Sequence, residues 1–188
     1  MPSFIGPNST EYSFDHLDSF VLEAKVTLGD DEFIFPLKVK FRWHCWSRDI
    51  EPNDDPGWVL PANPNEPKPR AFCPDRWEYS KKVVAMLKAA PWRVTCHATT
   101  KAGHYFRLEQ AGINANRPGI EGWYMFYQLN ADLDDSAGLE ISIESVHYRD
   151  KLPTNARGTM PIAFWRTLVE YLRTRPDIQS AFRKAKGP

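Results

Sequence analysis

The sequence has little cysteine and no long apolar run. Its three cysteines, Cys45, Cys73 and Cys96, are too sparse, and odd in number, for a secreted disulfide framework. No stretch reaches the ~20 apolar residues that a helix needs to cross a bilayer. The N-terminus has no basic region followed by an apolar core, so no signal peptide is predicted. We therefore expect a cytoplasmic protein with no membrane span.

The sequence also lacks the short motifs of several enzyme classes. It has no Gly-rich phosphate loop of the G-x-x-x-x-G-K-[S/T] or G-x-G-x-x-G type, and no G-x-S-x-G nucleophile elbow. Zinc sites usually show paired ligands such as C-x-x-C, whereas His44 directly precedes Cys45 and Cys96 directly precedes His97. Neighbours on a strand point to opposite faces, so neither pair is expected to chelate. We predict no metal and no cofactor, with Cys45 and Cys96 as small core residues.

The chain carries no excess of charge of either sign. Its 24 basic and 24 acidic residues give a formal net charge of zero. This argues against a protein that coats nucleic acid non-specifically, because such binding needs a strong positive field. The charge is nevertheless unevenly distributed: the charged residues within 1–35 are mostly acidic, and those within 151–188 are mostly basic. The basic end is either a solvated surface or a binding face.

What the sequence does contain is a set of alternating apolar segments. The clearest is 33–46, where apolar residues from Leu37 to Cys45 alternate with a basic row. That row comprises Lys38, Lys40, Arg42 and His44. Further strands are predicted over 18–28, 92–99, 103–110, 122–130 and 138–150, and helices over 73–91, 160–176 and 176–187.

This order of elements predicts an α+β fold. We expect a single, mostly antiparallel, curved sheet of about five to six strands with helices packed on it. One domain should span residues 1–188, with a long loop at 48–74 that contains seven prolines. Regular alternation along 138–150 would place Ser145 and His147 on the face of Ile143, and Tyr148 on the other face.

Polar side chains gather at the predicted strand ends and at the start of the first helix. His or Tyr can move a proton and Arg can stabilise a phosphorane, which is the chemistry of metal-free RNA cleavage. The alternative is that these residues are hydrogen-bonded scaffolding. The candidate catalytic residues are His44, Arg48, Arg76, Ser145 and Tyr148, and the candidate binding residues are Ser47, Arg70, Ser80 and Arg42.

Three short motifs within these segments carry a resemblance to a protein family. They are "FRWHCWSRD", "RAFCPDRWEYS" and "ISIESVHYRD". Together they resemble a poorly characterised family of bacterial proteins from phages, prophages and plasmids, in which a strand ends His-Cys-aromatic-Ser/Thr. The resemblance covers roughly residues 37–150 and implies a mobile-element context without a specific chemistry.

Two functions from different classes follow. The first is a metal-independent, ribonuclease-like or nucleic-acid-acting protein of a mobile element or toxin system, with RNA as its partner. The alternative is a non-enzymatic phage or plasmid protein that binds a host protein and inhibits a host defence system. A structural part of a mobile element is a third hypothesis. Clustering of the polar set in one cleft would favour the enzyme, and an exposed aromatic patch would favour the binder.

Overall fold

The structure is a computed structural model of the 188-residue chain. It describes residues 3–28, 31–64, 66–89, 95–98, 104–108, 122–131, 139–149 and 162–163. Most of the two helices predicted over 160–176 and 176–187 lies outside these residues. Within the first of them, Ile162–Ala163 form a short strand, β11, and not a helix. No helix in the described ranges is long and apolar enough to cross a membrane.

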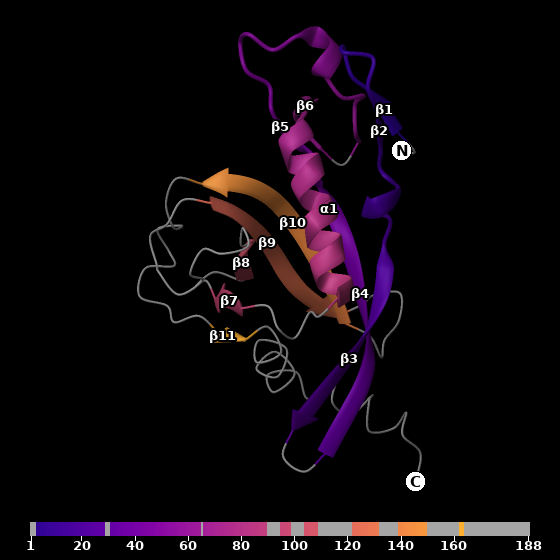
Figure 1. Ribbon diagram of the computed structural model, residues 1–188, viewed down its shortest axis with the longest axis vertical. Helices are drawn as coiled ribbons and strands as arrows, with labels where there is room; N and C mark the ends of the chain where they lie inside the picture. The colour runs from indigo at the N-terminus through magenta and orange to yellow at the C-terminus, as the bar shows by residue number, and fades with distance from the viewer. Residues whose placement is uncertain are drawn as a thin grey trace.

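Seven strands form the main sheet in the order β11-β7-β8-β9-β10-β4-β3. β4 and β10 run parallel, and the other neighbouring strands are antiparallel. The β3–β4 hairpin extends past the end of β10, because β10 pairs with β4 only from Leu37 onward (Figure 1). The strands, besides β11, are β3 Phe20–Leu28, β4 Asp31–His44, β7 Thr95–Ala98, β8 His104–Leu108, β9 Gly122–Ala131 and β10 Leu139–Arg149.

Two small sheets accompany the seven-stranded main sheet, so the prediction of one curved sheet of five to six strands was wrong in its sheet count, its strand number and its curvature. One pairs β1 (Ser3–Ile5) with β2 (Glu11–Ser13), and the other pairs β5 (Ser47–Asp49) with β6 (Arg70–Phe72). Both lie in segments too short for alternation to reveal. The mixed α and β content is confirmed: the described residues also contain helix α1 (Pro74–Ala89) and the 3-10 turns Asp15–Leu17 and Pro56–Trp58.

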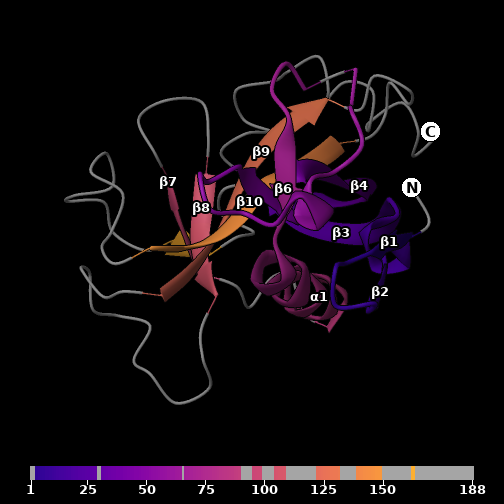
Figure 2. The same ribbon diagram turned by 90° about the horizontal axis from the view of Figure 1, so that it is seen from above.

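The main core lies between α1 and one face of the sheet (Figure 2). Val83 and Leu87 of α1 are fully buried there, and the period of four between them places both on one side of the helix. Tyr79 of α1 stacks on Trp123 of β9, with ring centroids 3.8 Å apart. The sheet contributes Leu37, Val39, Met125, Tyr127, Leu129, Leu139, Ile141, Ile143 and Val146.

A second, aromatic core joins the N-terminal segment to the segment between β5 and β6. Phe72 of β6 is its centre: its ring lies 4.6 Å from Tyr12, 4.9 Å from Phe4 and 5.9 Å from Trp58. Trp77 at the start of α1 meets Tyr12 edge to face. This cluster packs the Pro-rich stretch against the N-terminal segment and the start of α1.

Candidate functional site

Some of the predicted polar residues meet near the end of β4, beside its parallel neighbour β10. Ser145 of β10 pairs in register with His44, the last residue of β4. The chain then turns, with the Cys45 amide donating to the Arg42 carbonyl at 2.9 Å, and continues directly into β5. Cys45 points into the main core with no exposed surface, as predicted, and burial raises the pKa of its thiol. The side chain of Cys96 lies outside the described part.

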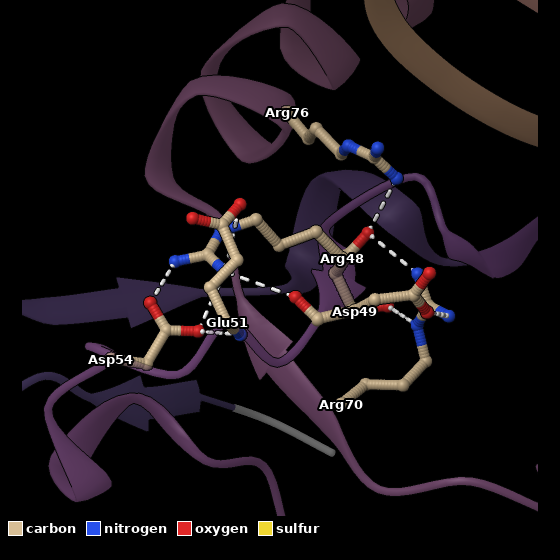
Figure 3. Close-up of polar contacts among 7 residues, drawn as sticks. Arg48, Asp49, Glu51, Asp54, Arg70 and Arg76 are labelled. Atoms are coloured by element: carbon tan, nitrogen blue, oxygen red, sulfur yellow. Dashed lines mark hydrogen bonds and ion pairs between the residues drawn. The ribbon is translucent and has the colours of Figure 1, made fainter.

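Arg70 and Arg76 both hold the start of β5 (Figure 3). The buried Arg70 donates through Nε to Ser47 Oγ at 2.8 Å and through Nη2 to the Ser47 carbonyl at 3.3 Å. Arg76 donates through Nη1 to the same carbonyl at 2.6 Å and to the His44 carbonyl at 3.2 Å. Ser47 Oγ donates in turn to the Trp43 carbonyl at 2.8 Å. Two predicted site arginines therefore fix the main chain of residues 44–47.

Arg48 turns away from this point and fastens the chain that follows β5. Its guanidinium binds both carboxylate oxygens of Asp54, one of them at 2.6 Å, and lies 3.8 Å from Glu51 (Figure 3). The hydrogen bonds from Arg48 lower the pKa of Asp54 to about 2. Asp54 also accepts from the Glu51 amide at 2.7 Å, so the pair closes a local turn.

His44 is half-buried beside the segment that connects β5 to β6. Its Nε2 lies 3.4 Å from Oε2 of Glu66, and its side chain is 40 % exposed. Burial lowers the pKa of His44, and the charges of Arg70 and Arg76 lower it further against the opposing effect of Glu66. The imidazole is therefore neutral at pH 7 and available to accept or donate a proton.

Two of the predicted binding residues, Ser80 and Arg42, make hydrogen bonds within the fold. Ser80 is fully buried in α1 and donates to the Trp77 carbonyl at 2.6 Å. Its oxygen lies 2.7 Å from Nε2 of His16, which must then be the donor, so this bond ties the N-terminal segment to α1. Arg42 donates to Ser142 Oγ at 2.9 Å across the sheet.

A β-bulge in β10 reverses the predicted faces of its second half. The register along β9 and β4 shifts between Ile143 and Ser145. Ile143 and Val146 are both fully buried in the main core, although regular alternation would place them on opposite faces. Ser145 and His147 therefore share the face of His44, away from α1, and not the face of Ile143 as regular alternation predicted.

Tyr148 consequently lies on the α1 side of the sheet. It pairs with Trp123 in register, meets that ring edge to face at 6.1 Å, and is 51 % exposed. The structure thus brings His44, Ser145 and Arg76 together and places Tyr148 across the sheet from them. A proton relay between His44 and Tyr148 has no support in this geometry.

His147 lies on the same face of the sheet, although it was not among the candidate site residues chosen from the sequence. Its ring stacks on Phe126 at 4.9 Å with an interplanar angle of 9°, and Arg149 Nε donates to its Nε2 at 2.8 Å. Burial lowers its pKa to about 4, and the charges of Arg76 and Arg149 add to this effect. The signal in the sequence was its spacing of two from Ser145, which keeps the two side chains on one face of the strand.

A pocket of about 310 Å³ lies beside the site, under the segment between β5 and β6. Trp43, Leu60 and Arg70 form part of its wall, together with Glu66, the partner of His44. Prolines 61, 67 and 69 line it and are exposed. No pattern in the sequence pointed to Trp43 or Glu66, because the pocket depends on how the Pro-rich segment folds back.

The described residues contain no group of three His, Cys, Asp or Glu side chains that could hold a metal ion. The absence of a metal or cofactor from the function stays a prediction. Two acidic groups near the site already have side-chain partners: Asp49 binds Arg70 at 2.8 Å, and Glu66 contacts His44.

Comparison with known proteins identifies a family but no individual relative. No curated protein matches the chain, and no solved structure matches it. A family model described as the YjaZ family matches residues 4–172. The match supports the expected membership of a poorly characterised family, whereas the association with phages and plasmids stays a prediction. Because the match covers most of the sequence, the chain belongs to the YjaZ family.

Proposed function

We propose that the protein is a non-enzymatic binding protein that presents the segment between β5 and β6 to a protein partner. We call residues 50–69 of this segment the loop platform. The observation that carries the proposal is the use of Arg70 and Arg76, which bind the main chain of residues 44–47. These bonds fix the turn from which the segment starts, and the Arg70–Asp49 pair ties its two ends together; a preformed loop loses less entropy when it binds.

The loop platform has the surface of a recognition element. Prolines 61, 64 and 67 are exposed, and Ile50 and Val59 are 39 % and 38 % exposed. The aromatic core and the Arg48–Asp54 pair attach the segment to the rest of the fold. The partner class predicted from the sequence is a host protein, such as a component of a defence system.

A paired variant tests this proposal. Pro61→Arg combined with Pro67→Arg places two charged side chains on the platform, and Ala85→Arg on an exposed site of α1 is the matched control. After cross-linking in cells, quantitative mass spectrometry should show partners that the control retains and the platform variant loses. The melting temperatures of all three proteins should agree within a few degrees, because the substituted sites are exposed.

A metal-independent ribonuclease is the second candidate, favoured by the shared face of His44, Ser145 and His147 near Arg76. If it is correct, purified protein cleaves RNA in EDTA, and His44→Ala lowers the rate by roughly 10²–10⁴-fold without loss of stability. If the binding proposal is correct, the RNA stays intact and His44→Ala changes nothing in this assay. Cleavage that depends on His44 would overturn the binding proposal.

A further inference from the structure

β3 forms one edge of the main sheet in the part of the chain that the structure describes. It pairs with β4 on one side, and no described strand lies on its other side (Figure 1). Such an edge presents a row of backbone N–H and C=O groups to any further strand, and proteins usually protect it with proline, bulges or short length. β3 has none of these protections: it is nine residues long, contains no proline, and pairs with β4 without a register shift.

Pro36 of β4 indicates which backbone groups of β3 face outward. Proline has no N–H, so within a sheet its nitrogen faces an open edge. β10 pairs with β4 only after this residue, so the open edge beside Pro36 is the one away from β3. Pro36 pairs in register with Glu23, and the two residues of such a non-hydrogen-bonded pair direct their backbone groups away from each other. The N–H and C=O of Glu23, and by alternation those of Lys25, therefore point to the outer edge.

The sequence of β3 complements itself when it is read in the opposite direction. Ala24 is the middle residue of the strand, and Glu23 and Lys25 flank it with opposite charges. If two copies of β3 lie antiparallel with Ala24 opposite Ala24, each Glu23 lies opposite a Lys25, and each Phe20 lies opposite a Leu28. Opposite charges directly across two strands stabilise the pairing, whereas like charges destabilise it. The charges on this edge therefore attract a second copy instead of repelling it.

We propose that β3 binds β3 of a second copy of this chain, in an antiparallel register centred on Ala24. The register is symmetric, so one two-fold axis generates both halves of the interface and joins the two main sheets into one. Glu23 and Lys25 of opposite copies exchange both of their outward-facing backbone hydrogen bonds. Val21, which is 62 % exposed, is covered in the same way at either end of the interface. This surface is made by β3 and not by the loop platform, so it does not rest on the proposed function.

Sedimentation equilibrium of the full chain tests the interface over a roughly thousandfold range of concentration, from micromolar to millimolar. Wild type should pass from monomer to dimer within this range. Lys25→Glu and Glu23→Lys each turn two attractive pairs into two repulsive pairs, so each should weaken dimerisation about tenfold or more. The double variant that exchanges the two residues keeps the composition and net charge of wild type, and it should restore the wild-type affinity. A monomer at every concentration, a dimer that the single changes leave intact, or a double variant no better than the single ones would overturn the proposal.

Hydrogen exchange measured by NMR gives a second readout that needs no variant. The amides of Glu23 and Lys25 should exchange slowly in the dimer and quickly after dilution to the monomer, because they point to the outer edge. The amides of Ala24 and Val26 point to β4 and should be protected at both concentrations. Equal protection of Glu23 and Lys25 in the monomer would show that another segment of the same chain covers this edge, and the proposal would be wrong. This measurement decides the case if a charge variant does not fold.

Discussion

At the scale of single residues, the arginines differ in what their loss would leave behind. Arg70 is 6 % exposed and satisfies two oxygens of Ser47, a residue that is itself fully buried. Arg70→Ala removes the donor to Ser47 Oγ and one of the two arginine donors to the Ser47 carbonyl, and it should lower the free energy of unfolding by about 2–4 kcal/mol, because buried groups lose a charged donor. Arg48→Ala removes a pair at the surface and should lower the free energy of unfolding clearly less than Arg70→Ala does. Urea unfolding of both variants measures the difference, and equal losses would contradict the scaffold role of Arg70.

His147 should make the stability of the protein depend on pH. Its folded pKa of about 4 lies below the ordinary value of 6.5, so the unfolded chain takes up a proton first as the pH falls. Stability is therefore complete above pH 6.5 and declines toward pH 4, by at most about 3 kcal/mol from this residue. The lowered pKa values of His16 and His44 act in the same direction. Urea titrations at pH 7 and pH 5 should show a smaller decline for His147→Phe than for wild type, and an unchanged decline would contradict this account.

At the scale of elements, alternation in the sequence located the strands of the main sheet but not their irregularities. The six predicted strands all occur in it, because each is a run of apolar and β-prone residues bounded by turn residues, with the clearest alternation along 33–46. The bulge between Ile143 and Ser145 has no signal in the sequence pattern. Its one extra residue moves each later side chain of β10 to the opposite face of the sheet. Ser145, His147 and Tyr148 were consequently assigned to the wrong faces, and the assignment of His44 was unaffected.

The short elements were missed for a different reason. β5 and β6 have three residues each, and their pairing depends on contacts across more than twenty positions of sequence. The arginines that hold them were recognised as important polar residues, but a sequence cannot show whether a guanidinium meets a carbonyl or a ligand. The pocket and the contact between His44 and Glu66 have the same origin, since both require the fold of the platform.

At the scale of the whole molecule, the fold has two hydrophobic cores that share residues. Phe41 and Trp46 pack against both the main core under α1 and the aromatic core around Phe72. The N-terminal segment is attached to the same region through His16 and Ser80 and through the Trp77 indole, which donates to the Ser13 carbonyl at 2.8 Å. These links predict that the cores unfold together, as one domain.

A pair of core truncations tests this prediction. Phe72→Ala removes the centre of the aromatic core, and Leu87→Ala removes a side chain of the main core; both are almost completely buried. Each should cost about 2–5 kcal/mol through lost burial and the cavity that remains. If the cores are coupled, each variant lowers one shared transition, seen alike by tryptophan fluorescence and by far-UV circular dichroism. If Phe72→Ala instead splits the transition in two, with the main sheet melting at the wild-type temperature, the aromatic core is an independent unit and the single-domain organisation is wrong.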